Sequence, residues 1–259
     1  MSSRLIALDK QPGMRLVRVG ETWRLPFAKI LIKVTGPEAT MACQDYQLCD
    51  GLKAEIYVKF HGVQAIWDEK LTMEGWVFML VDTKNAFNEI NQTGILWTVH
   101  NLCPSGYCFV FNCYYRWSSL VLGNRNETAS FLNSREVVMQ GDPLEMISYG
   151  IGILPLIKNL KWEIHDVTQT WYTDYAGSLG TFVKIETYFN SLTLQGLGGG
   201  YHPKSSKSIL IVHPENIKVG KVFGERHGFK VCTGARYLGG YIGDNQSKSD
   251  RLREHTLMM

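Results

Sequence analysis

The stretch Trp76-Val77-Phe78-Met79-Leu80-Val81-Asp82 indicates the central element of the fold. Its first six residues are all apolar, and a continuous apolar run of this length is typical of a central strand buried on both faces. Because the run stops at Asp82, we expect the carboxylate of this residue at the edge of a sheet. An aspartate in such a place is most often a turn or cap residue, so on its own it assigns no function.

A second aspartate, Asp174, has a similar setting. Residues 169–171 and 178–181 flank Tyr172-Thr173-Asp174-Tyr175, which predicts a short β-hairpin with Asp174 near its tip. Carboxylates on neighbouring strands supply the hard oxygen ligands that Mg²⁺ prefers, and phosphoryl transfer from a nucleoside triphosphate commonly uses two such ions. Asp82 and Asp174 are therefore candidate ligands of a divalent metal.

The remaining apolar spacing predicts helices alternating with further strands. Helices are expected over residues 42–67, 88–102 and 182–194, and a further one is expected to open at Asp142-Pro143. Extended segments are expected in a hairpin region over 4–28 and at 136–139, 207–212 and 237–242. This order predicts an α+β sandwich, in which helices pack on one face of an antiparallel sheet.

The composition is that of an ordinary globular protein. Of 259 residues, 45% are hydrophobic and 20% are charged, which predicts a substantial core. The formal net charge of +3 is mildly basic, and it permits a nucleic-acid partner without requiring one. None of the six cysteines forms a CxxC pair, so we expect free thiols in a reducing compartment rather than a zinc site.

Two features bear on location. Asp9 and Lys10 interrupt the first apolar residues early, so the N-terminal segment does not read as a secretory signal peptide. The longest nearly apolar run, residues 146–157, is too short to cross a bilayer. The sequence therefore predicts an intracellular protein, nuclear or cytoplasmic, that is not secreted and does not enter a membrane.

Four segments, in this order, carry a resemblance to a known family: VDTKNAFNEIN (81–91), VMQGDPLEM (138–146), WYTDYAGSLG (171–180) and YLGGYIG (237–243). They resemble the polymerase motifs of reverse transcriptases, in particular those of non-LTR retrotransposons. Residues 5–24 are similar to the fingers strands of that family, and the likeness continues through 47–55, 203–212 and 234–240, so it covers nearly the whole chain.

The resemblance implies a right-hand polymerase fold, with a fingers-like region at 1–70, a palm-like region at 71–259 and no recognisable thumb. It also implies an RNA-directed DNA polymerase that takes an RNA template, a DNA primer and deoxynucleoside triphosphates, with Mg²⁺ or Mn²⁺ as cofactor. The oligomeric state is left open.

By position, Asp82 resembles the first metal-binding aspartate and Asp174 the first aspartate of the catalytic hairpin. Phe87 is similar to the bulky gate that excludes a ribose 2′-hydroxyl, although a plain core residue is the alternative. Gln140 and Gly141 match the motif that lies along the incoming nucleotide and the template. Gln140 could instead be a capping residue.

Three basic residues complete the candidate site. Lys207 is similar to the lysine that faces the triphosphate, and Arg15 and Lys10 resemble fingers residues near the same phosphates. The alternative for Lys207 is a charge on an edge strand that prevents aggregation.

The sequence departs from the family at the hairpin. Tyr175 stands where the family has a second aspartate, and a phenol is neutral at pH 7 and a poor ligand for Mg²⁺. Leu16 and Leu25 likewise replace an expected proline and an expected basic residue. We therefore expect polymerase activity to be absent or reduced by orders of magnitude.

The sequence is also compatible with other functions. The chain could be a non-catalytic nucleic-acid-binding remnant of a retroelement, or a product with no function. A nucleotide hydrolase is disfavoured, because the glycine run at 198–200 follows a predicted helix and lacks the GK[ST] ending of a phosphate loop.

Overall fold

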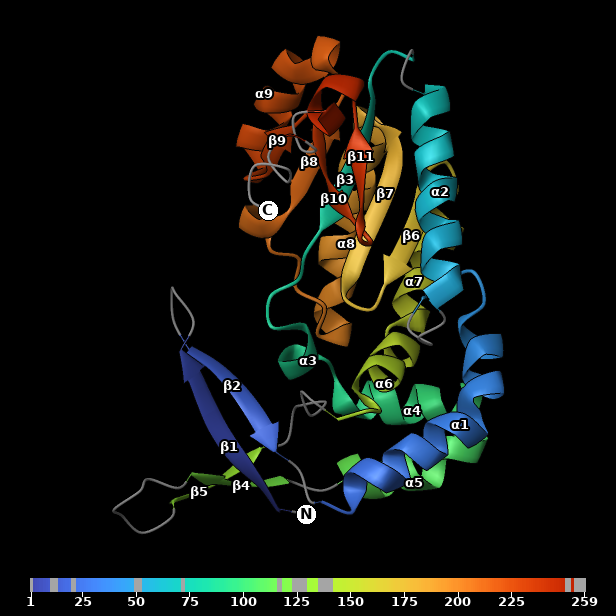
Figure 1. Ribbon diagram of the computed structural model, residues 1–259, viewed down its shortest axis with the longest axis vertical. Coiled ribbons are helices and arrows are strands. Elements are labelled where there is room, and N and C mark those ends of the chain that lie inside the picture. Colours follow the sequence, from blue (N-terminus) through green and yellow to red (C-terminus); the bar gives the residue numbers. More distant parts are fainter. Residues whose placement is uncertain are drawn as a thin grey trace. The chain divides into compact units, whose positions relative to one another are not determined.

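The computed structural model (Figure 1) describes residues 2–9, 14–19, 22–48, 53–70, 73–115, 118–122, 130–134, 142–249 and 253. The chain forms two compact units. The first unit contains Met1–Asp50, Asn85–Leu156 and Leu197–Tyr201, and the second contains Gly51–Lys84, Ile157–Gly196 and His202–Met259. The units do not coincide with the fingers-like region 1–70 and the palm-like region 71–259, whose assignment stays a prediction.

The second unit is built on a five-stranded sheet in the order β6-β7-β3-β8-β9. Neighbouring strands are antiparallel, except that β8 and β9 are parallel. The central strand β3 has no exposed surface from Val77 to Val81, which confirms the strand predicted there. The strands are β3 (Trp76–Val81), β6 (Thr168–Tyr172), β7 (Tyr175–Thr181), β8 (Ile209–Val212) and β9 (Lys230–Cys232).

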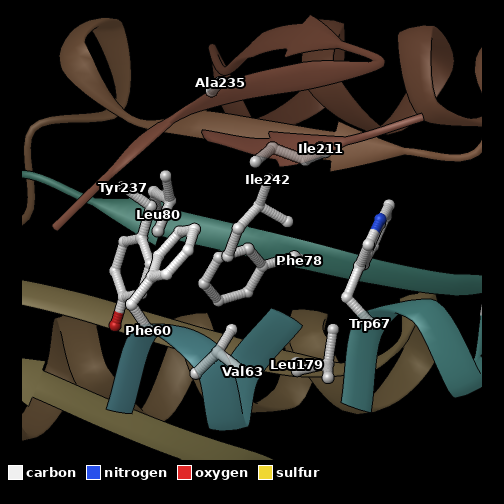
Figure 2. Packing of buried hydrophobic residues seen from close by; sticks show 10 residues of the cluster. All are labelled: Phe60, Val63, Trp67, Phe78, Leu80, Leu179, Ile211, Ala235, Tyr237 and Ile242. Atoms are coloured by element: carbon white, nitrogen blue, oxygen red, sulfur yellow. The ribbon is translucent and has the colours of Figure 1, made fainter. Parts of the chain in front are cut away.

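One face of this sheet is covered by α2 (Lys53–Lys70) and by a hairpin of β10 (Gly234–Tyr237) and β11 (Gly240–Gly243). Figure 2 shows Phe78 and Leu80 of β3 between α2 and this hairpin. The apolar cluster on this face, called here the palm cluster, consists of Phe60, Val63, Trp67, Phe78, Leu80, Leu179, Ile211, Ala235, Tyr237 and Ile242.

The opposite face carries α8 (Phe182–Gly199) and α9 (Ile217–His227). Side chains alternate between the faces of a strand, so Gly180, which pairs with Val77, lies on the face opposite Phe78, where it meets Ile185 of α8. The rings of Phe182 and Phe223 join α8 to α9 at a centroid distance of 5.6 Å. Helices therefore pack on one face as expected, and α2 with the β10–β11 hairpin closes the other.

The single strand predicted at 237–242 is wrong, because this segment turns back on itself. Tyr237 pairs with Gly240, and the two turn residues, Leu238 and Gly239, have φ angles of 46° and 85°. Positive φ at both central positions matches the right-handed twist of two hairpin strands. Gly240 is also required by packing, since a Cβ there would overlap the ring of Phe60 in the palm cluster.

The first unit combines a four-stranded sheet, in the order β2-β1-β4-β5, with helices. Its elements are β1 (Ser2–Asp9), β2 (Met14–Val19), α1 (Arg24–Cys43), α3 (Ala86–Glu89), α4 (Gln92–Leu102), α5 (Pro104–Tyr114), β4 (Ser118–Leu122), β5 (Ser130–Ser134) and α6 (Glu145–Gly152). A further helix, α7 (Leu154–Glu163), spans residues of both units, and short 3₁₀ turns occur at Ser205–Lys207 and Pro214–Asn216.

The N-terminal hairpin prediction holds only in part. The strands β1 and β2 are antiparallel as expected, but the expected hairpin region ran to residue 28, whereas α1 begins at Arg24. The sequence hides this helix for two reasons. Pro37 lies inside it and its apolar side chains surround the axis, with Phe27 and Val34 exposed and Ala39 and Cys43 buried. The sequence of α1 therefore lacks the amphipathic pattern, with one apolar side, by which a surface helix is recognised.

Two other predicted helices begin later than expected. The segment 88–102 is divided at Asn91, whose side chain accepts a hydrogen bond from the Gly94 N–H at 3.0 Å and so caps α4. The helix expected at Asp142-Pro143 begins at Glu145, after Asp142 Oδ1 accepts from the Leu144 N–H at 2.9 Å. The extended segment predicted at 136–139 lies outside the described residues. No described helix is both long and apolar enough to cross a bilayer.

Two glycines near the end of α8 are expected to respond oppositely to alanine. Gly200 has a φ of 77°, and a Cβ there would overlap the carbonyl oxygen of Glu89, whereas a Cβ at Gly198 meets nothing within 4 Å. Gly200→Ala should lower the free energy of unfolding by about 2–3 kcal/mol. Gly198→Ala should leave it unchanged or raise it by up to about 1 kcal/mol. Urea denaturation of both variants measures this, and equal effects would contradict the arrangement.

Candidate active site

Asp82 and Asp174 lie at the same end of the five-stranded sheet. Asp82 follows Val81, which pairs with Ala176 on the neighbouring strand β7. Tyr172 pairs with Tyr175, so Thr173 and Asp174 form the two-residue turn between β6 and β7. This hairpin and the strand that ends before Asp82 were both predicted, and the register places the two carboxylates together in the second unit.

The hairpin turn holds Asp174 in a fixed setting. Thr173 is 3% exposed and has a φ of 49°, an unfavourable value for a β-branched residue. Its hydroxyl lies 2.8 Å from the Tyr172 carbonyl oxygen and 3.1 Å from Asp174 Oδ1. Strain of this kind persists only where the surroundings determine the conformation. Thr173 thus helps to position the carboxylate of Asp174, a role that the sequence analysis did not predict.

The carboxylates repel each other. Burial raises the pKa of Asp174, and the charge of Asp82 raises it further. Hydrogen bonds from its own backbone and from Thr173, together with the positive charge of Lys207, act in the opposite direction. A half-buried pair of like charges is therefore only partly compensated, which is a setting that attracts a cation.

Lys207 lies beside this pair. Its Nζ is 3.4 Å from Asp82 Oδ2, with the lysine side chain 45% exposed and the aspartate side chain 24% exposed. Lys207 is the last residue of the 3₁₀ turn Ser205–Lys207, and the strand β8 begins two residues later, at Ile209. In the sheet, β8 lies between β3 and β9 and is therefore not an edge strand. The alternative role of an edge-strand charge is therefore wrong.

Tyr175 occupies the position across from Asp82. It shares a sheet face with Gly177 and Leu179, and its ring packs against the palm cluster. Burial raises the pKa of its phenol, and the charges of Asp82 and Asp174 add to this, so the group stays neutral. Its packing role was not apparent from the sequence, which marked it only as a missing carboxylate.

The donor set fits one divalent cation better than two. Asp82 and Asp174 offer carboxylate oxygens at one place, whereas Tyr175 adds a neutral phenol and Lys207 adds a positive charge. Within the described ranges, no group of three or more His, Cys, Asp or Glu side chains could hold a metal. The pair can therefore hold one hard cation, and the neighbouring side chains oppose a second.

The other predicted site residues are placed as follows. Phe87 lies in α3 of the first unit, where its half-buried ring meets that of Tyr149 at 4.9 Å between centroids. The backbone of Arg15 is in β2, paired with Leu8. Lys10, Gln140 and Gly141 lie outside the described residues.

Asp142 has a second role besides its turn. It accepts a hydrogen bond from Arg24 at 2.5 Å between Oδ2 and Nε, and the two side chains are only 3% and 5% exposed. The guanidinium carbon of Arg24 also lies 5.2 Å from the centre of the Tyr114 ring. This buried ion pair joins the starts of α1 and α6 to α5 within the first unit, and no local sequence pattern predicts it.

Comparison with known proteins gives one kind of match. No protein-family model matches the chain, and neither does any curated protein sequence. Telomerase from Candida tropicalis is similar in structure, with a TM-score of 0.65 at 9% identity over 95% of this chain and 49% of that one. A C-terminally truncated form of that telomerase gives 0.59 at 13% identity, over 81% and 50% of the two chains.

Telomerase from Candida albicans, in complex with the TWJ fragment of telomeric RNA, gives a TM-score of 0.61 at 10% identity over 82% of this chain and 43% of that one. The chain thus spans about half the length of the telomerases that it matches. Likeness at this identity shows the fold. It confirms the α+β architecture predicted from the apolar spacing and the right-hand polymerase fold implied by the motif resemblance. The chain has a right-hand polymerase fold of the reverse-transcriptase type.

Proposed function

We propose that this chain is the fingers and palm of an RNA-directed DNA polymerase from a non-LTR retrotransposon, with nucleotidyl transfer impaired at Tyr175. The observation that carries the proposal is the meeting of Asp82 and Asp174 at one end of the sheet, in a chain with this fold. The motif resemblance, rather than the telomerase likeness, supports the retrotransposon origin.

In this proposal Asp82 and Asp174 would hold Mg²⁺ or Mn²⁺ beside the reacting groups. The 3′-hydroxyl of a DNA primer on an RNA template attacks the α-phosphate of the deoxynucleoside triphosphate, and pyrophosphate leaves. A divalent cation there would supply charge neutralisation at the transferring phosphoryl group. The two carboxylates would supply the oxygen ligands of this cation, and the turn with Thr173 holds Asp174 in place for that role.

The remaining residues act on the deoxynucleoside triphosphate. Phe87 excludes a ribose 2′-hydroxyl with its ring, and Gln140 with Gly141 borders the base-paired nucleotide. Lys207, Arg15 and Lys10 contact the phosphates, to which lysine and arginine are well suited.

A second function, a non-catalytic nucleic-acid-binding remnant, is favoured by one observation. The carboxylate pair is flanked by a neutral phenol and by the ammonium of Lys207, an arrangement that opposes the second metal. Such a remnant would hold an RNA–DNA duplex through backbone contacts and shape, with affinity that falls as salt rises.

Primer extension on an RNA template separates these functions. With Mn²⁺ we expect extension at least about a hundredfold below the roughly 10 s⁻¹ of a median enzyme. Asp82→Asn should remove it, because the pair then loses half its charge. Asp68→Asn, which removes an exposed carboxylate of α2, is the matched control and should change nothing. Rapid extension by the natural chain would contradict the impairment. Salt-dependent duplex binding with no extension would establish the remnant.

A further inference from the structure

The carboxylate pair already has a positive charge beside it. The ammonium of Lys207 lies 3.4 Å from Asp82 Oδ2, and its charge also acts on Asp174. A divalent cation bound by the same oxygens would have to share them with this ammonium or displace it.

Backbone hydrogen bonds place the segment that carries Lys207 beside Asp82. The Lys204 N–H donates to the Asp82 carbonyl oxygen at 2.8 Å, and the Lys84 N–H donates to the His202 carbonyl oxygen at 2.8 Å. The Thr83 hydroxyl donates to that same His202 oxygen at 2.8 Å. The segment that carries Lys207 is thus paired directly with the segment that carries Asp82.

The 3₁₀ turn Ser205–Lys207 then directs the Lys207 side chain toward the carboxylate of Asp82. The Lys207 N–H donates to the Lys204 carbonyl oxygen at 2.9 Å, which sets the lysine three residues beyond the pairing with Asp82. The ammonium therefore lies near the carboxylates because of backbone hydrogen bonds, and not because of a long free loop.

We infer that Lys207 is an internal counter-ion of the Asp82–Asp174 pair and competes with a divalent cation for it. The inference rests on the proposed function, in that it takes this pair as the metal site. It adds a reason for weak metal binding that is independent of Tyr175.

The competition has a limited size. Both side chains of the ion pair are partly exposed, and loss of an ion pair of this kind changes a Kd by no more than about fivefold. Lys207 also repels a divalent cation directly. The phosphates of a deoxynucleoside triphosphate would attract the ammonium of Lys207 and so free the carboxylate of Asp82 for the metal. Binding of the metal and binding of the nucleotide should therefore each strengthen the other.

Manganese binding to the full chain tests this without any reliance on catalysis. Free Mn²⁺ is measured by its electron paramagnetic resonance signal as the purified protein is titrated. Lys207→Met, which keeps the length of the side chain and removes its charge, should lower the Kd by about two- to fivefold. Lys204→Met removes an exposed charge three residues away and should change the Kd less than about twofold.

Asp82→Asn separates failure of the inference from failure of the proposed function. If Asp82→Asn weakens Mn²⁺ binding but Lys207→Met does not tighten it, the competition is refuted and the metal site stands. If Asp82→Asn leaves Mn²⁺ binding unchanged in both the natural chain and the Lys207→Met variant, the pair is not the metal site and both proposals are wrong. Lys207→Gln should tighten binding as Lys207→Met does, and a discrepancy between them would also refute the charge argument.

Discussion

Replacing Tyr175 by aspartate is expected to raise the rate of primer extension with Mn²⁺ by about a hundredfold. Tyr175 lies across from Asp82 on the neighbouring strand, so an aspartate there would add a third carboxylate to the site. Metal ions supply several kcal/mol of stabilisation to a phosphoryl-transfer transition state, and about 2.7 kcal/mol corresponds to a hundredfold in rate. Single-nucleotide extension by the purified variant measures the gain.

Tyr175→Asn is the matched control for this gain. Asparagine has the shape of aspartate and also removes the ring from the palm cluster, but it adds no charge. It should leave the extension rate at the low level of the natural chain. Equal rates for the two variants would show that relief of bulk, and not the carboxylate, matters. No gain with a folded Tyr175→Asp protein would contradict the proposed cause of impairment.

The same substitution should cost stability. The aromatic ring of Tyr175 is half-buried against the palm cluster, and like charges on directly opposed residues are destabilising. Circular dichroism therefore accompanies the activity measurement, so that a loss of fold is recognised. Mn²⁺ should recover part of the stability of Tyr175→Asp, since a ligand that binds the folded state stabilises it.

Arg24→Ala is expected to lower the free energy of unfolding of the first unit by about 3–5 kcal/mol. Arg24 and Asp142 are almost fully buried, and removal of the guanidinium leaves the carboxylate in a poorly solvated place. The loss is larger than for a surface ion pair, which contributes at most about 1 kcal/mol. Urea denaturation followed by far-ultraviolet circular dichroism measures it.

Two controls identify the cause of that loss. Lys29→Ala, on the exposed side of the same helix, should change stability by less than about 0.5 kcal/mol. The double variant Arg24→Met with Asp142→Asn removes both charges and keeps an Oδ1 acceptor for the Leu144 N–H. It should recover most of the loss, because no charge is then buried alone. A double variant as unstable as Arg24→Ala would show that packing of the arginine, and not its charge, is what matters.

Local patterns predicted the centre of the five-stranded sheet well. The strand before Asp82 and the hairpin around Asp174 can each be recognised from their own residues alone. The first is a continuous apolar run, and the second is two extended segments around a short turn. The same patterns failed at α1, where buried and exposed apolar residues surround the helix and Pro37 lies inside it. They also failed at Leu238 and Gly239, since a tight turn of two residues interrupts what looks like one strand.

For the site, the sequence supplied the side chains but not their neighbours. It marked Asp82, Asp174 and Lys207 through the motifs and showed that Tyr175 is not a carboxylate. It did not show that Lys207 lies against Asp82, or that Arg24 and Asp142 form a buried pair, because each contact joins residues far apart in the chain.

By itself, then, the sequence determined which strands and turns form around the two aspartates, and that a tyrosine rather than an acid follows Asp174. Those properties follow from local apolar periodicity and from the chemistry of single side chains. Only the tertiary structure decided which charges meet: strand register set Tyr175 across from Asp82, and backbone pairing brought Lys207 to the same carboxylate. Electrostatic energy depends on the distance between charges and on their exposure to water, and folding fixes both.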